Sequence, residues 1–293
     1  MKLVASIAAI LAVVLLAGCG SGGGGSGGGG KAATTTSANG KAPQTANAAK
    51  PRKPIGPPPD RESLKEAEKR ISAAVSSNDC AKINSLNPVS IPQLDTSARC
   101  NYLKRLGGDA NLAGGQEFKN LAAVLDYTTP QRKFSVILLR DVDGLYHVLS
   151  IDPFLKSGTV GTPFAQQFDA AAKQAFDALK AKDCNAYYDV AYRLSGVGSL
   201  PKDKVCPHVE QNPIAGVLEN DPSAEPKPIG GNAYFAFYGL DTPQAFLTMV
   251  MLKQSTADRP SGLPKGAGIV PKGAAEYAYF GSYRTNLPNP PSG

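Results

Sequence analysis

Apolar residues recur every three or four positions in two separate stretches of the chain, a spacing typical of amphipathic helices. The first stretch begins after Asp60, which is placed to cap a helix; its apolar positions are Leu64, Ala67, Ile71, Ala74 and Val75. The second begins at Thr162-Pro163, a favourable cap and first turn; its apolar positions are Phe164, Phe168, Ala171, Ala175 and Leu179. The pattern predicts one long helix at the start of each half of the chain.

A period of two replaces the helical spacing further along the first half. Three segments are predicted as strands: Phe118–Thr128, Lys133–Arg140 and Leu145–Ile151. Asp141-Val142-Asp143-Gly144 joins the last two and is typical of a hairpin turn. Helices followed by a meander of strands predict an α+β fold, with the helices packed on one face of a curved antiparallel sheet.

Three landmarks of the first half return in the same order in the second. The two helical stretches end at Asp79-Cys80 and Asp183-Cys184, and a second cysteine follows 20 residues later in one case and 22 in the other. Thr129-Pro130-Gln131 and Thr242-Pro243-Gln244 each precede an apolar strand. Offsets of 104, 106 and about 113 residues indicate a duplication. We therefore expect two tandem α+β domains, at residues 60–155 and 163–286.

The first 59 residues have a different character. Met1-Lys2 precedes Leu3–Ala17, an apolar run with Ser6 as its one polar residue, which is short for a membrane span. Leu16-Ala17-Gly18-Cys19 resembles the bacterial lipobox. The resemblance implies that signal peptide 1–18 is removed, that Cys19 is diacylated, and that the protein is extracytoplasmic and held on the bacterial cell membrane. The alternative is an ordinary secretory signal cut near Gly18.

Residues 19–59 carry the lipidated cysteine and then a Gly-, Ser-, Pro- and Lys-rich segment without apolar periodicity, which predicts a disordered tether; 287–293 is predicted as a disordered tail. The net charge of +7 owes six positive charges to residues 1–59, which leaves about +1 for the rest. A nucleic-acid partner is therefore not expected. The basic tether would instead lie beside anionic lipid headgroups, or act only as a solubilising spacer.

With Cys19 set aside, four cysteines remain for an extracytoplasmic protein, and three pairings are possible. One pair per repeat predicts the disulfides Cys80–Cys100 and Cys184–Cys206, each worth roughly 3 kcal/mol by the chain-entropy model. Reactive thiols are the competing interpretation. The chain has no Cys-x-x-Cys motif and two histidines, so neither a metal site nor a cofactor is expected.

The Asp-Cys helix ends, the second cysteines and the late strands together resemble the cystatin-like α+β cone fold of the nuclear transport factor 2 superfamily. The resemblance covers 60–155 and 163–286, and both segments lack the usual tryptophan. It implies a sheet wrapped round an apolar pocket, used by some members for isomerase or dehydratase chemistry and by many for binding alone.

Candidate ligand-binding residues fall in both halves. Asp126, Tyr127 and His147 would give a pocket an acid, a hydroxyl and a base, or else are strand residues in ordinary packing. The second half is predicted to carry two additions, Asp221–Gly231 and Ser255–Ala274. In the longer one Arg259, Lys265 and Lys272 would meet an acidic ligand or cell-wall polymer, or are solvated. Nearby aromatics, Tyr279 among them, would form core and in part line a pocket.

Taken together, the sequence predicts a lipid-anchored envelope protein that acts as a non-catalytic module binding a small apolar ligand or an envelope protein. The alternatives are a pocket enzyme of isomerase or dehydratase type, and a structural spacer or secretion accessory without a ligand.

Overall fold

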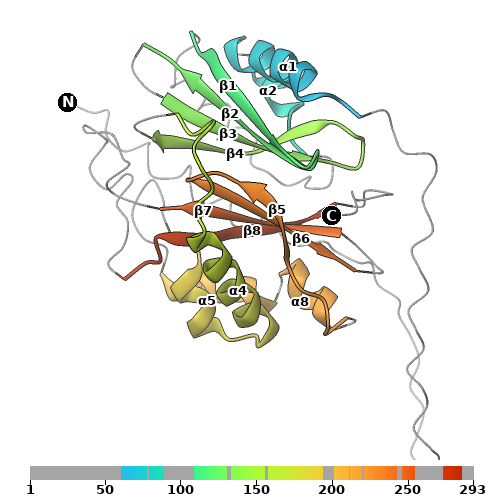
Figure 1. Cartoon of the computed structure of the whole chain (residues 1–293), viewed down its shortest axis with the longest axis vertical. Helices are drawn as coiled ribbons and strands as arrows, with labels where there is room; N and C mark the ends of the chain where they lie inside the picture. The colour runs from blue at the N-terminus through green and yellow to red at the C-terminus, as the bar shows by residue number, and fades with distance from the viewer. Residues whose placement is uncertain are drawn as a thin grey trace, which may run out of the picture.

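The computed structural model describes residues 61–77, 79–88, 109–130, 133–155, 158–193, 201–210, 212–219, 221–242, 246–254 and 273–285. Within these ranges the chain forms two four-stranded antiparallel sheets, one after the other, with helices on their outer sides (Figure 1). The predicted α+β class with tandem sheets is confirmed. The lipobox, the tether, Cys100 and the C-terminal tail lie outside the described residues.

The first unit begins with two helices and continues as a simple meander. Its elements are α1 (Leu64–Ser76), α2 (Cys80–Asn84), β1 (Asn111–Phe118), β2 (Ala122–Thr128), β3 (Lys133–Arg140) and β4 (Tyr146–Leu155), with the strands in that order across the sheet. The predicted cap at Asp60 is wrong, because Ser63 caps α1. The Ser63 side chain accepts from the Glu66 amide and the Glu66 carboxylate accepts from the Ser63 amide at 2.8 Å, a capping box that the sequence Ser63-x-x-Glu66 already contains.

Strand β1 was not predicted. The expected strand Phe118–Thr128 is instead the last residue of β1 and all of β2, separated by a tight turn in which Lys119 and Asn120 have φ of 46° and 55°. Gly114 and Gly115 lie within β1, and glycine is a poor indicator of a strand. β1 forms because it has β2 to pair with, which local sequence does not reveal.

The second unit repeats the order, with five helices among its described residues and two among those of the first unit. Its elements are α4 (Gln167–Lys180), α5 (Cys184–Val190), α6 (Lys202–Val205), α7 (Pro207–Glu210), α8 (Pro213–Leu218), β5 (Lys227–Gly231), β6 (Phe235–Asp241), β7 (Phe246–Lys253) and β8 (Tyr277–Thr285). The predicted start at Thr162-Pro163 is wrong, because α4 begins at Gln167. The Thr162 hydroxyl instead donates to the Thr159 carbonyl and accepts from the Ala233 amide.

The Pro-rich segment Asp221–Gly231 is not an addition to the second unit. It contains β5, which holds the same edge position as β1, and both strands have a register irregularity just before a Gly-Gly pair, at Leu112/Gly114 and Pro228/Gly230. An edge strand tolerates Pro228 because its missing N–H can face away from the ladder. The repeat is therefore more complete than the sequence suggested.

The two sheets pack face to face, and the helices cover their outer faces (Figure 1). Side chains alternate along each strand between the two environments. In β2, Val124 faces the other sheet and Leu125 faces α1. In β6, Phe237 faces the other sheet and Tyr238 faces the helices of the second unit. We call the layer between the sheets the inter-sheet core; its larger members are Phe118, Ile137, Leu139, Leu149, Phe235, Phe237, Val250 and Phe280.

Equivalent bulges mark the two units. The pairing of β3 with β4 shifts between Ile137 and Leu138, and that of β7 with β8 shifts between Val250 and Met251, 113 residues later. The extra residues, Leu149 and Phe280, both enter the inter-sheet core. The first bulge also places Ile151 on the helix side, although Leu149, two residues before it, faces the inter-sheet core.

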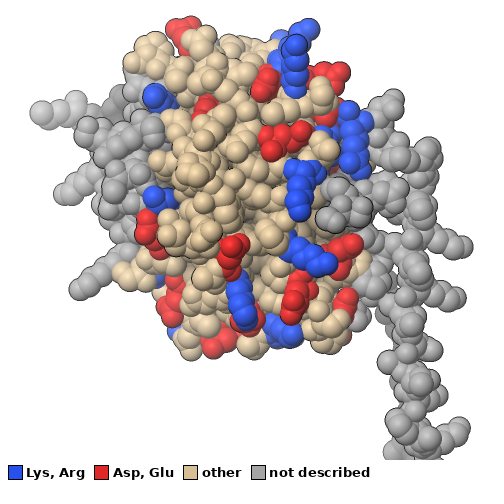
Figure 2. Space-filling view, viewed as in Figure 1, with Lys and Arg blue, Asp and Glu red and all other residues tan. Residues whose placement is uncertain are grey.

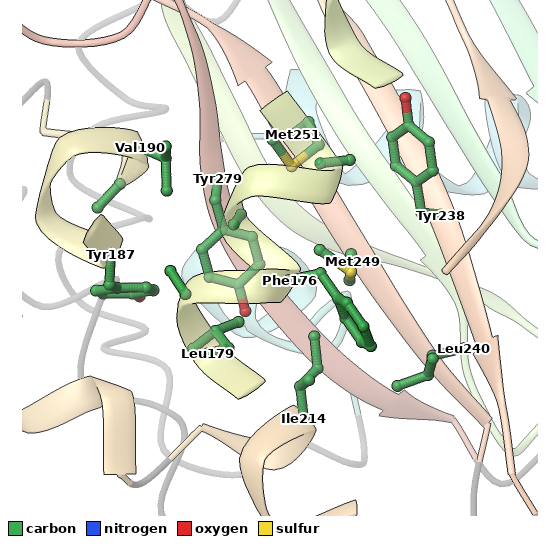
Figure 3. Close-up of a cluster of buried hydrophobic side chains, with 14 of the residues drawn as sticks. Phe176, Leu179, Tyr187, Val190, Ile214, Tyr238, Leu240, Met249, Met251 and Tyr279 are labelled. Carbon is green, nitrogen blue, oxygen red and sulfur yellow. The ribbon is translucent and has the colours of Figure 1, made fainter. Parts of the chain in front are cut away.

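The helix side of the second sheet forms a separate core (Figure 3). There Met249 and Met251 of β7 and Tyr279 of β8 lie against α4, α5 and α8, and the Tyr187 and Tyr279 rings meet edge to face with centroids 5.8 Å apart. Each sheet is therefore buried on both faces. This explains the nearly unbroken apolar runs of β3 and β7.

Truncation of Phe237 tests the inter-sheet core. Phe237 has no exposed surface, and its ring centroid lies 5.4 Å from that of Phe118 in the other sheet. Phe237→Ala is expected to lower the free energy of unfolding by ~3–5 kcal/mol, because it leaves a cavity between the sheets. Urea unfolding measures this change. Phe164→Ala, at a phenylalanine that is 36% exposed, is the control and should cost less than ~1 kcal/mol; equal losses would contradict the prediction.

Candidate functional site

The carboxylate of Asp126 lies at the junction between the two units. It is buried and accepts four hydrogen bonds: from the Ser135 hydroxyl at 2.6 Å, the Thr159 hydroxyl at 2.9 Å, the Val160 amide at 2.7 Å and the Thr159 amide. Gly158 precedes these residues, and a Cβ there would lie 2.9 Å from the Asp126 carboxylate. Asp126 thus fixes the segment that leads out of the first unit.

Asn232 binds the same segment from the second unit. Its side chain is fully buried, donates to the Thr159 carbonyl at 3.2 Å, and accepts from the Tyr234 and Phe235 amides at 2.9 and 3.0 Å. Asp126, Thr159 and Asn232 therefore link the two units through one buried residue of the connection. We call this arrangement the linker junction. Its hydrogen bonds give Asp126 a positioning role between the two units.

Tyr127, adjacent to Asp126 in β2, points to the opposite side of the sheet. Its ring is buried against α1 and stacks on Phe134 with centroids 5.2 Å apart, and its hydroxyl lies 3.0 Å from that of Ser72. Burial raises the pKa of Tyr127 to about 12. The predicted acid and hydroxyl consequently do not face one site.

His147 lies toward the other end of the first sheet. Its Nε2 is 2.8 Å from a carboxylate oxygen of Asp143, and its Nδ1 is buried without a hydrogen-bond partner. His147 pairs with Leu139 of β3, whereas Asp126 pairs with Ser135, four residues away on the same strand. At about 3.3 Å per residue this separates the two positions by about 13 Å. The structure does not bring the predicted acid and base together.

Tyr279 belongs to a closed polar triangle inside the second unit. Its hydroxyl accepts from the Asn212 side-chain amide nitrogen at 2.8 Å and donates to the Ser282 hydroxyl at 2.9 Å, which in turn donates to the Asn212 side-chain oxygen Oδ1 at 2.9 Å. Burial raises the pKa of Tyr279 to about 12. The remaining candidate residues, Arg259, Lys265 and Lys272, lie outside the described residues.

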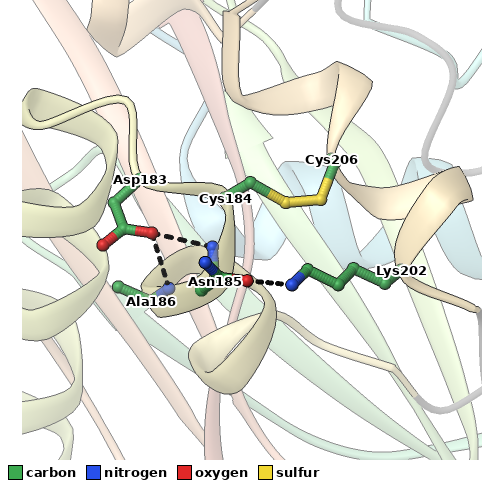
Figure 4. Close-up of a disulfide and its surroundings, with 6 residues drawn as sticks. All are labelled: Asp183, Cys184, Asn185, Ala186, Lys202 and Cys206. Carbon is green, nitrogen blue, oxygen red and sulfur yellow. Dashed lines mark hydrogen bonds between the residues drawn. A yellow bond between two sulfur atoms is a disulfide. The ribbon is translucent and has the colours of Figure 1, made fainter.

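The predicted disulfide Cys184–Cys206 is confirmed, with Cα atoms 5.2 Å apart (Figure 4). It joins the first residue of α5 to the residue after α6. Asp183 caps α5 by accepting from the Asn185 and Ala186 amides at 2.8 and 3.2 Å, and Lys202 donates to the Asn185 side chain.

The first unit repeats this cap. Asp79 accepts from the Ala81 amide at 2.9 Å, and Cys80 is disulfide-bonded; its predicted partner Cys100 lies outside the described ranges. The Asp-Cys pair therefore recurs because an N-cap aspartate precedes a bonded cysteine in both units.

A buried charged cluster in the first unit escaped the sequence analysis. Arg140 is 2% exposed, and its guanidinium donates to the carbonyls of Asn120 at 2.6 Å, Glu62 at 2.9 Å and Gly144 at 2.6 Å. The guanidinium also lies 3.5 Å from the Glu117 carboxylate and 4.1 Å from the centroid of the Tyr146 ring.

The Glu62 carboxylate extends the cluster to α1. It binds Arg70 through two hydrogen bonds of 2.7 and 2.8 Å and accepts from the Tyr146 amide at 2.8 Å. These contacts pin the start of the first unit to the β3–β4 turn.

Arg193 is the second buried arginine that sequence analysis missed. Residues 191–193 follow α5, and Ala191 forms an isolated parallel bridge with Tyr279 of β8, with the Tyr192 amide donating to the Tyr279 carbonyl at 2.7 Å. Arg193 is 5% exposed, and its guanidinium carbon lies 4.3 Å from the centroid of the Tyr188 ring. Its backbone amide donates to the Gln254 side chain at 3.2 Å, whereas its side-chain Nε is buried without a hydrogen-bond partner. No local sequence pattern predicts this site, because it depends on the contact of residues 191–193 with β8, which lies far along the chain.

The described surface offers one further feature, on the helices of the second unit. A shallow hollow over α4 and α5 is lined by Ala170, Lys173, Gln174, Asp177, Ala178, Ala181, Asp183 and Ala186, none of which was a predicted ligand residue. Basic and acidic side chains are interspersed on the face in Figure 2 and do not segregate by sign.

Within the described ranges, no group of three or more His, Cys, Asp and Glu is placed to hold a metal ion. None of the described helices has the length and apolar composition needed to cross a membrane.

Neither a scan of protein-family models nor a search of curated proteins finds a match to this chain.

Neutralising Asp126 tests the linker junction. Asp126→Asn keeps the shape but removes the charge that four donors share, so the free energy of unfolding is expected to fall by ~2–4 kcal/mol. Limited proteolysis within 158–166 should accelerate at the same time, because the connection loses its anchor. Urea unfolding and mass mapping of the fragments measure the two effects. Asp177→Asn, at a carboxylate that is 55% exposed, should change neither; wild-type behaviour of Asp126→Asn would refute the role.

The buried tyrosines predict a loss of stability at alkaline pH. Tyr127 and Tyr279 have pKa values of about 12 in the folded protein, against 10.0 for an unperturbed tyrosine. Between these values the unfolded chain releases protons that the folded chain keeps, so stability is full below pH 10 and falls as the pH rises toward 12. With 11 Tyr and no Trp, tyrosinate absorbance follows this directly. A folded protein whose tyrosines all titrate together near 10, as in denaturant, would contradict it.

Proposed function

We propose that this protein is a lipid-anchored, extracytoplasmic envelope protein whose two-sheet body is a non-catalytic binding or interaction module. The observation that carries the proposal is the Cys184–Cys206 disulfide. Disulfides of this structural kind persist in oxidising, extracytoplasmic compartments. Together with Leu16-Ala17-Gly18-Cys19 at the N-terminus, the bond favours export followed by anchoring.

The tether determines where the body would act. Residues 20–59 are rich in glycine, serine and proline, and a coil of this length spans about 35 Å on average. Five lysines and arginines along it would be attracted to anionic headgroups. The body would then sit close to the membrane surface, free to meet ligands or partners within the tether's reach.

The interior of the body favours binding over pocket chemistry. The faces of the two sheets that look toward each other are filled by the inter-sheet core, and Asp126 is held by the linker junction about 13 Å along the strand from the His147 position. Binding would accordingly use a site other than the space between the two sheets. The likeness of each unit to the cystatin-like cone fold is part of the proposal, and the binding function does not depend on it.

Cys19 is the residue that tests the anchor. The wild-type chain, expressed in a bacterium, is expected in the membrane fraction with a mature mass that begins at Cys19 and includes acyl groups. Cys19→Ser should abolish acylation and shift the protein out of the membrane fraction, because the thiol is the site of lipid attachment. Fatty-acid labelling, fractionation and intact mass measure these outcomes.

Cys184→Ser is the matched control, since it removes the disulfide while leaving Cys19 intact. It should remain acylated and membrane-bound. A wild-type protein recovered from the cytosol with unmodified Cys19 and free thiols would refute the proposal.

A further inference from the structure

Arg193 lies where several parts of the second unit meet. It follows the short segment beside β8, its amide binds Gln254 at the end of β7, and its guanidinium rests on the Tyr188 ring of α5. The Gln254 side chain is itself fixed, because it donates to the Ala275 carbonyl at 2.7 Å. The surroundings of Arg193 are therefore built from separate elements of the second unit.

Arg140 shows what a structural buried arginine looks like in this chain. Its donors reach three backbone carbonyls, a carboxylate lies 3.5 Å away, and the Tyr146 ring covers one face. Every part of its charge is compensated. A buried guanidinium ordinarily needs this, because removing a charge from water is costly unless partners replace the water.

Arg193 has only the aromatic part of this arrangement. Its side chain is 5% exposed, yet within the described part of the chain it makes no hydrogen bond or ion pair, and its Nε is buried without a partner. The Glu276 carboxylate, next in the chain to the Ala275 carbonyl that Gln254 binds, lies 3.6 Å from the Lys253 ammonium. The positive charge of Arg193 is thus left without a compensating anion by the residues described.

The geometry specifies what would compensate it. Tyr188 covers a face of the guanidinium, and the N–H donors of a guanidinium point outward in its plane. A group that accepts two such hydrogen bonds side by side is a carboxylate or a phosphate. We propose that Arg193, stacked on Tyr188, is an oxyanion-binding residue through which the second unit takes a carboxylate or phosphate group of its ligand. This deepens the proposed binding function but does not depend on the lipid anchor.

Thermal unfolding and calorimetry of the full chain test the site, with inorganic phosphate and succinate as probes and chloride at equal ionic strength as the reference. At least one probe is expected to bind and to raise the melting temperature of the wild type, because it binds the folded state alone. A response to phosphate only, or to succinate only, identifies which oxyanion the site takes. If neither probe acts beyond chloride, the proposal is overturned.

Two variants locate the effect. Arg193→Met should weaken probe binding about tenfold or more, since it removes a charge-assisted pair of donors. Lys173→Met removes the same charge from a side chain that is 76% exposed and should bind like wild type. In chloride, Arg193→Met is expected to melt at the wild-type temperature or above, because an uncompensated buried charge is lost. A strong drop in melting temperature, or unchanged probe binding, would mark Arg193 as structural and overturn the proposal.

The outcome is separable from that of the Cys19 experiment. Oxyanion binding by a chain that proves to be cytosolic would leave the Arg193 site standing and remove the envelope function. An acylated, membrane-bound chain without oxyanion binding would leave the envelope function standing and remove the Arg193 site.

Discussion

The mutual burial of the two sheets is the constraint on which the rest of the structure depends. Each unit has a sheet with two apolar faces; its described helices cover one of them, and the sheet of the other unit covers the second. The other face would expose residues such as Phe118 in one unit and Phe237 in the other to water. Full burial of such a side chain is worth about 1.5–3 kcal/mol. The tandem arrangement buries these residues, because the sheet of the second unit covers the face that the helices of the first unit leave open.

Apolar contact does not by itself fix how two sheets are oriented, since hydrophobic burial is non-directional. The linker junction supplies direction. Thr159 is held from one side by Asp126 and from the other by Asn232, so the connection leaves the first sheet and enters the second along one path. The two bulges place their extra residues, Leu149 and Phe280, in the inter-sheet core at equivalent positions of the two units. The linker junction and the bulges therefore determine how the two sheets are oriented, and the burial of apolar surface between the sheets stabilises this orientation.

The buried charges of the two units are handled differently, and the difference bears on function. In the first unit Arg140 and Glu62 are fully engaged with backbone and side-chain partners and brace the β3–β4 turn. In the second unit Arg193 is stacked on Tyr188 without such partners among the described residues. The second unit is thus the one that contains the oxyanion site that we propose.

The sequence alone determined the features that depend on neighbours along the chain. The helical spacing of Ala67, Ile71 and Val75, the hairpin at Asp141–Gly144 and the recurrence of Asp-Cys at an interval of 104 residues are local patterns, and from them the α+β class, strand β3 and the Cys184–Cys206 bond could be predicted. The tertiary structure decided what depends on partners distant in the chain. The Gly-containing edge strands β1 and β5, the role of Asp126 and the burial of Arg193 follow from pairing and packing across tens of residues. The reason is physical. The preferences of a residue and its neighbours set the local conformation, whereas burial and hydrogen-bond partners are set by the distant segments of the chain that pack against that residue.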